Sequence, residues 1–126
     1  MSTRSAIAMK VADDKYLAIY NHFDGYKAGV GAKLKQFYTD PEKVKKLIAL
    51  GNISWLGQEV DIPENVKHSF EEPVDNITIA YGRDRGETNQ EAESCVSIND
   101  IKISFDHDRN VYIFEDGKWT YNGVEL

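Results

Sequence analysis

The stretch from residue 5 to residue 22, SAIAMKVADDKYLAIYNH, decides the fold, because its apolar residues alternate with other residues at a period of two. The alternating apolar positions are Ile7, Met9, Val11, Leu17 and Ile19. Segment 12–15, ADDK, separates the two runs and has the composition of a turn. The sequence therefore predicts a β-hairpin, with Asp24-Gly25 ending its second strand.

After Ala28 the apolar period changes to that of a helix. One helical stripe contains Val30, Leu34, Phe37 and Tyr38. A second helix follows, with Asp40 as its N-cap, Pro41 at its first position and Gly51 as its stop. Its apolar face contains Val44, Leu47 and Ile48. The sequence thus predicts two consecutive helices.

The remaining chain is dominated by short alternating segments. Residues 52–75 predict a long, partly packed connection, and residues 76–81 a strand. Residues 87–95 fit a short helix or a loop. Residues 97–105 alternate like a strand, although Ser97 with Asp100 also fits a helix start.

Two more strands are expected on either side of Asp116-Gly117, which is a strong hairpin signal. We therefore predict an α+β fold, a mostly antiparallel β-sheet with two consecutive helices packed on it. The length of 126 residues suits a single domain, 1–126.

Composition and charge exclude several classes of protein. The chain has 15 Lys+Arg and 21 Asp+Glu, a formal net charge of −6, which argues against a binder of nucleic acid polymers. The single cysteine, Cys95, excludes a disulfide framework and a cysteine-based zinc site. The start of the chain lacks a secretion signal and no apolar run is long enough to span a membrane, so we expect a cytoplasmic protein.

The first candidate binding segment is residues 20–26, YNHFDGY, at a strand end and turn. Its rings can stack on a base, and its polar groups can bind base edges or a ribose hydroxyl. The predicted ligand contacts are Asn21, His22, Phe23, Asp24 and Tyr26. The alternative is that Tyr20 and Phe23 belong to the core and that Asp24-Gly25 is only a turn.

The second candidate is residues 82–86, GRDRG, directly after Tyr81. Arginine forks bind phosphate with two hydrogen bonds, and the flanking glycines let the backbone approach an anion. We predict Arg83 and Arg85 as phosphate ligands, joined by Arg109, and Tyr81 as a stacking surface. The alternative is a hairpin loop in which Asp84 only neutralises the arginines.

The third candidate is residues 106–110, DHDRN. Two aspartates around a histidine suggest a metal site, but on a strand His107 points away from the face that Asp106 and Asp108 share. We therefore expect a loop that contributes Arg109 to an anion pocket, with no metal and no cofactor.

Motifs along most of the chain resemble those of small phage-borne proteins, the first-described Thoeris anti-defence family, which are signal sponges. The matching segments are Ser2-Thr3-Arg4-Ser5-x-Ile7, Ile19-Tyr20-x-His22-Phe23-Asp24-Gly25-Tyr26, Gly29-x-Gly31, Thr39-Asp40-Pro41-Glu42-Lys43-Val44, Leu50-Gly51-x-Ile53, Leu56-Gly57, Tyr81-Gly82-Arg83-Asp84-Arg85-Gly86 and Asp116-Gly117-Lys118-Trp119. The chain departs from the pattern at Phe23, where many relatives carry Trp, and at Asn21, where others have Cys or Arg.

This resemblance implies a non-catalytic protein that sequesters cyclic nucleotide immune signals in the host bacterial cytosol. The implied ligands are cyclic ADP-ribose isomers and cyclic di- or trinucleotides, and the implied assembly is a homodimer or a higher homo-oligomer.

Two other functions stay open at this stage. A small hydrolase of the same signals would place His22, Asp24 and the acids of residues 106–108 at a metal. A protein-binding inhibitor of a host factor would use the acidic surface or exposed Trp55 and Trp119.

Overall fold

The predicted hairpin lies at the centre of one mixed sheet in the computed structural model, which describes residues 3–105 and 110–126. Strands β1 (Ser5–Ala12) and β2 (Lys15–Asn21) pair antiparallel, from Ser5 opposite Asn21 to Ala12 opposite Lys15. The prediction from the period-two pattern is confirmed, including the strand end before Asp24-Gly25.

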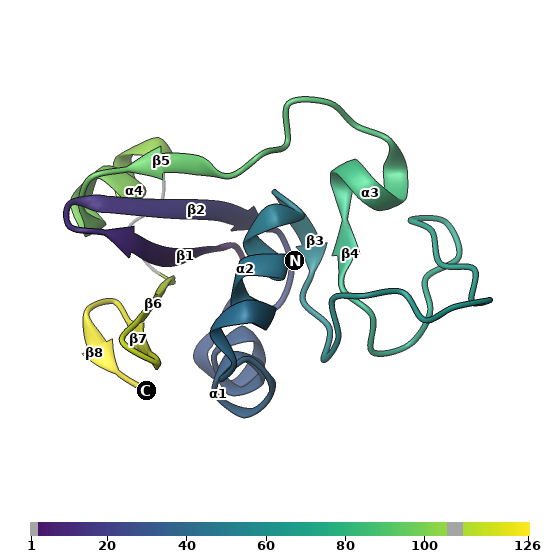
Figure 1. The fold of residues 1–126 in the computed structure, drawn as a ribbon, viewed down its shortest axis with the longest axis horizontal. Coiled ribbons are helices and arrows are strands. Elements are labelled where there is room, and N and C mark those ends of the chain that lie inside the picture. Colours follow the sequence, from purple (N-terminus) through teal and green to yellow (C-terminus); the bar gives the residue numbers. More distant parts are fainter. Residues whose placement is uncertain (1–2, 106–109) are drawn as a thin grey trace.

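Six further strands complete the described sheet (Figure 1). They are β3 (Ile53–Trp55), β4 (Ile79–Ala80), β5 (Glu93–Cys95), β6 (Val111–Glu115), β7 (Lys118–Tyr121) and β8 (Val124–Glu125). The order is β4-β3-β2-β1-β6-β7-β8, and β5 pairs with the first half of β2. The β1–β6 and β2–β3 pairs are parallel and the others antiparallel, so the predicted α+β class is confirmed.

Two consecutive helices cover one face of the sheet, as predicted. A π-helical turn (η1, Lys27–Gly31) leads into α1 (Ala32–Phe37), and α2 (Pro41–Ala49) follows. Asp40 caps α2 by accepting a hydrogen bond from the Glu42 N–H, and Gly51 ends it at φ +79°. The apolar stripes of both helices join the main core with Ile7, Ile19, Ile53, Tyr112 and Trp119.

The opposite face carries a short helix where alternation had favoured a strand. Residues Ile98–Ser104 form α4, whose Ile101 packs on the small side chains Ala6, Ala8 and Ala18. The Ser97 hydroxyl accepts a hydrogen bond from the Asp100 N–H, so the alternative helix start is the correct prediction. The strand prediction was wrong because a capped turn outweighs a short alternating pattern.

The predictions for residues 52–95 need four further corrections. The connection 52–75 contains β3, and the predicted strand 76–81 shrinks to β4. Residues Tyr81–Arg85, predicted as part strand and part tight loop, form the short helix α3, which Gly86 ends at φ +74°. Residues 87–95 were predicted as a short helix or a loop; the loop is correct for 87–92, but residues 93–95 form β5, because they pair with β2. Figure 1 shows α3 and β4 at the opposite end of the molecule from β7 and β8.

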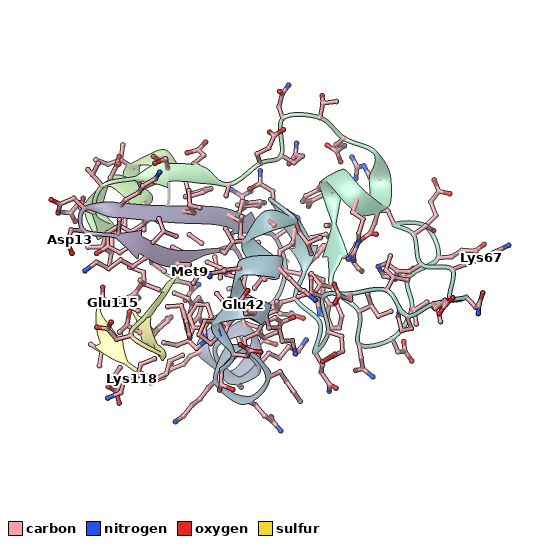
Figure 2. All side chains as sticks on the ribbon, in the orientation of Figure 1. Met9, Asp13, Glu42, Lys67, Glu115 and Lys118 are labelled. Atoms are coloured by element: carbon pink, nitrogen blue, oxygen red, sulfur yellow. The ribbon has the colours of Figure 1, made fainter. Side chains whose placement is uncertain are left out.

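A long loop between β3 and β4 extends from this end, and Lys67 lies at its far tip (Figure 2). Tyr38, fully buried, anchors the base of the loop, because its hydroxyl donates to the Gly57 carbonyl at 2.7 Å. Burial raises the pKa of Tyr38 to about 12, so the folded protein holds this phenol in its neutral form.

Stability should therefore fall in alkaline solution. The phenol ionises near pH 10 in the unfolded chain and near pH 12 in the folded protein. The contribution of Tyr38 is fully present below pH 10 and is lost as the pH rises towards 12, at about 1.4 kcal/mol per pH unit. Urea unfolding of the wild type and of Tyr38→Phe at pH 9.5 and 11.5 checks this. The stability difference between the two should shift by about 2 kcal/mol in favour of Tyr38→Phe, and a constant difference would contradict the assignment.

Candidate functional site

The first two predicted binding segments meet at Asn52, which precedes β3. The Tyr20 N–H donates to the Asn52 Oδ1 at 2.9 Å, and the Tyr81 N–H donates to the Asn52 carbonyl at 3.2 Å. Asn52 itself is tied to the loop before β5, since its N–H donates to the Gln90 carbonyl at 2.7 Å. One residue therefore sets the distance between the end of β2 and the start of α3.

Three rings follow one another along the end of β2. The Tyr20 hydroxyl and the His22 Nδ1 form a 2.6 Å hydrogen bond, and the Phe23 ring meets the His22 ring edge-to-face with centroids 4.5 Å apart. Tyr20 and His22 are half-buried, while Phe23 is 43% exposed. The alternative that Phe23 is a core residue is wrong, and its ring is accessible for stacking.

Arg4 and Tyr81 act electrostatically on Tyr20, the first of these rings. Burial raises the pKa of the Tyr20 phenol, the guanidinium of Arg4 lowers that pKa, and the phenol of Tyr81 raises it further. Arg4 is exposed and forms no ion pair with another residue of the described chain.

Arg85 stands over two rings on the far side of Tyr81. Its guanidinium carbon lies 4.7 Å from the Phe70 centroid and 5.6 Å from the Tyr81 centroid, and those two rings are 5.8 Å apart. The side chain is 50% exposed and its Nε lies 2.8 Å from the Glu87 carboxylate. The guanidinium is thus held by two rings and by Glu87, while half of the side chain remains exposed to solvent.

We call these two groups of rings, with their arginines, the cation–aromatic surface. It consists of Arg4, Tyr20, His22, Phe23, Phe70, Tyr81 and Arg85, and Asn52 links its two halves. Its chemistry suits an anionic ligand with flat rings, because it offers two guanidinium groups and several aromatic faces.

Arg83 has a different role from the one predicted. Its guanidinium donates to both oxygens of Asp84, to the Thr78 carbonyl at 2.8 Å and to the Val60 carbonyl. Four of its five N–H groups are engaged in this way. The interaction with Asp84, together with two backbone contacts, ties the long loop to α3 and leaves Arg83 unsuited to bind a phosphate.

Asp84 and His68 complete this buried network. The Asp84 carboxylate, 1% exposed, accepts the Ala80 N–H at 2.8 Å and lies 3.3 Å from the His68 Nε2. The Val74 N–H donates to the His68 Nδ1 at 2.9 Å, so the imidazole proton of the neutral ring sits on Nε2, facing Asp84 and the Thr78 carbonyl. The network is structural, and it holds α3 and thereby Arg85 in position.

Asn21 is also placed differently from the prediction. Its side chain is fully buried, and its Nδ2 donates to the Ser5 hydroxyl at 3.0 Å and to the Phe23 carbonyl at 2.8 Å. An interior amide cannot reach a ribose or a base on the surface. Asn21 therefore shapes the turn after β2, and the prediction of ligand contact is corrected.

Asp24 and Tyr26 lie in that turn. Asp24 adopts φ +58° and its carboxylate accepts the Trp55 indole N–H at 3.3 Å. The Lys33 ammonium lies 3.8 Å from the Trp55 ring centroid, and burial lowers the Lys33 pKa while Asp24 opposes that effect. Tyr26 is 47% exposed just before η1, and its hydroxyl forms no hydrogen bond with any of the described residues.

Most of the third candidate segment, residues 106–110, lies outside the part of the chain that the structure describes. Residues 106–109, and with them Arg109, lie outside the described residues. Within the described part of the chain, no group of three or more His, Cys, Asp or Glu side chains is arranged to hold a metal ion. The sequence analysis did not predict Arg4 and Phe70 as site residues, because nothing but their residue types pointed to such a role.

The alternative of a protein-binding inhibitor assumed that Trp55 and Trp119 are exposed, and this assumption is wrong for Trp119. Trp119 is 4% exposed and its indole N–H donates to the Tyr38 carbonyl at 2.8 Å, and Trp55 is half-buried beneath Lys33.

The hollow between α2 and the sheet and three further hollows among the described residues are lined by other side chains than the predicted site residues. The cation–aromatic surface therefore does not coincide with any of these four hollows.

Comparison with family models, curated proteins and solved structures finds no match to this chain. Among the described helices, none combines the length and the apolar character needed to cross a membrane.

Proposed function

We propose that this protein binds a small cyclic nucleotide on the cation–aromatic surface and sequesters it without cleaving it. The proposal takes its ligand class from the resemblance to phage anti-Thoeris sponges. The observation that carries it in the fold is Arg85, a half-exposed guanidinium that is fixed over Phe70 and Tyr81.

The chemistry of this surface matches the parts of such a ligand. A base stacked on an aromatic ring contributes about 1–3 kcal/mol, and Phe23 and Tyr81 offer rings for two bases. Arg85 and Arg4 supply charge-assisted hydrogen bonds to phosphates. Sequestration needs tight binding and no turnover, and these contacts bind without supplying an activated nucleophile.

The proposal includes a cellular setting. The protein would act in the cytosol of a phage-infected bacterium and would assemble as a homodimer or a larger homo-oligomer. An open face rich in rings on each copy is compatible with ligand pockets that two copies complete.

Calorimetry with cyclic ADP-ribose isomers and with cyclic di- and trinucleotides tests the proposal. We expect heat with at least one of them, and mass spectrometry of the ligand released by heating should find it intact. A cleaved product would favour the hydrolase, and no heat with any of these ligands would end the proposal.

Arg85→Ala should weaken binding about 10- to 100-fold, because one or two charge-assisted hydrogen bonds are lost. Lys67→Ala, which removes a positive charge at the far tip of the long loop, is the matched control and should leave the affinity within twofold (Figure 2). Equal losses in the two variants would mean that general charge attraction, and not Arg85, binds the ligand.

A further inference from the structure

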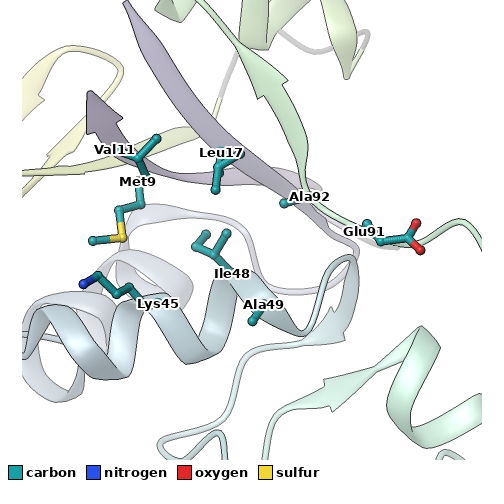
Figure 3. A pocket seen from close by; sticks show the side chains of 8 residues that line it. All are labelled: Met9, Val11, Leu17, Lys45, Ile48, Ala49, Glu91 and Ala92. Atoms are coloured by element: carbon teal, nitrogen blue, oxygen red, sulfur yellow. The ribbon is translucent and has the colours of Figure 1, made fainter. Parts of the chain in front are cut away.

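An apolar hollow lies between α2 and the sheet, on the helix-covered side of β1 and β2 (Figure 3). Its volume is about 420 Å³. Ligand sites in proteins are commonly hollows of about 300–1,000 Å³ with mostly apolar walls and a few polar groups. The lining residues are Met9, Val11, Leu17, Lys45, Ile48, Ala49, Glu91 and Ala92, six of them apolar.

Two alanines create the hollow. Ala49 ends α2 and Ala92 lies in the segment that leads into β5, so neither side chain is long enough to fill the space between these elements. As a result Val11 stays 43% exposed and Leu17 only half-buried. Apolar area left in water is unfavourable, so an apolar occupant that covers these side chains is favoured.

The charges at the mouth of the hollow select the polar end of that occupant. Lys45 lies beside Met9, and its ammonium pairs at 3.2 Å with Glu42, where both side chains are more than half exposed. Such an exposed pair is weak and exchanges readily. Glu91 lies at the opposite end and its carboxylate points away from the hollow (Figure 3). The positive group is therefore the one beside the apolar floor.

We infer that this hollow binds a medium-chain monocarboxylate, with its hydrocarbon chain against Val11, Leu17 and Ile48 and its carboxylate at Lys45. The site shares no residue with the cation–aromatic surface, so this second binding activity stands or falls independently of the proposed function.

Decanoate, kept below its micelle concentration, is the probe, and binding is followed by calorimetry and by NMR of the protein. Octanoate should bind about tenfold more weakly, because it lacks two methylene groups. Decyltrimethylammonium, which has the same chain and the opposite charge, should bind at least tenfold more weakly than decanoate.

Three single substitutions locate the site. Ala49→Leu should weaken decanoate binding at least tenfold by filling the hollow, and leucine is well tolerated in a helix at this exposed position. Lys45→Ala should weaken binding several-fold. Lys46→Ala is the matched control, since Lys46 is the next residue on α2, has the same 59% exposure and pairs with Asp61 away from the hollow. It should bind like the wild type.

The inference is overturned if decanoate gives neither heat of binding nor NMR chemical-shift changes. It is also overturned if Ala49→Leu binds decanoate as well as the wild type does, or if decyltrimethylammonium binds as tightly as decanoate. Analytical ultracentrifugation of the unliganded variants measures their oligomeric state. A change of oligomeric state in Ala49→Leu would identify the hollow as a contact between copies and would also overturn the inference.

Discussion

Asp84→Ala should lower the free energy of unfolding by about 3–5 kcal/mol, because it leaves a buried, hydrogen-bonded charge pair without one partner. The Asp84 side chain is 1% exposed, and its carboxylate accepts hydrogen bonds from the Arg83 guanidinium and from the Ala80 N–H. Its loss also removes the group that faces the Nε2 of His68. Urea unfolding followed by circular dichroism measures the change.

Asp61→Ala is the control, since Asp61 pairs with Lys46 at 2.8 Å but is 70% exposed. We expect a far smaller loss there, because water screens an exposed pair. Arg83→Met combined with Asp84→Ala should cost less than the sum of the two single changes, as neither charge is then left alone. Similar losses for Asp84→Ala and Asp61→Ala would contradict the structural role of this network.

Gly51→Ala should destabilise the protein by about 2–5 kcal/mol. The backbone at Gly51 has φ +79°, which costs a residue with a Cβ about 1–2 kcal/mol. A Cβ there would also lie 2.0 Å from the Gln90 carbonyl oxygen. The loop that leads into β5 would therefore have to move, at a further cost of about 1–3 kcal/mol.

The same movement would disturb the cation–aromatic surface. Gln90 holds Asn52, and Asn52 joins Tyr20 to Tyr81. We therefore expect Gly51→Ala to weaken cyclic nucleotide binding as well as stability.

Gly86→Ala is a closely matched control, because Gly86 has φ +74° but no atom within 4 Å of an added Cβ. It should cost only about 1–2 kcal/mol. Thermal unfolding of both variants separates the cost of the positive φ from the cost of the steric clash with Gln90. Equal shifts in Tm would show that the clash with Gln90 is unimportant.

Local chemistry determined the parts of the fold that the sequence predicted correctly. The β1–β2 hairpin follows from a period-two pattern, and α2 from the Asp40 cap, the apolar stripe and the Gly51 stop. These signals act between residues close in the chain, so they can be read without knowing the fold.

The candidate site depended more on tertiary contacts. The sequence predicted a cationic and aromatic site near residues 20–26 and 81–86, and of the rings it named, those of Phe23 and Tyr26 are exposed. It could not separate Arg83 from Arg85, because the two arginines differ only in what surrounds them. Arg83 donates to two carbonyls of the long loop between β3 and β4. Val60 lies near the start of that loop and Thr78 at its end.

By itself, the sequence determined the hairpin, the two consecutive helices and the supply of guanidinium groups and rings. The tertiary structure alone decided which of those groups face water. Asn21 is buried and hydrogen-bonded to Ser5 on the neighbouring strand, while the Phe70 ring lies against Arg85, which comes from a separate element. Burial and long-range contacts depend on residues distant in sequence, and no local pattern encodes them.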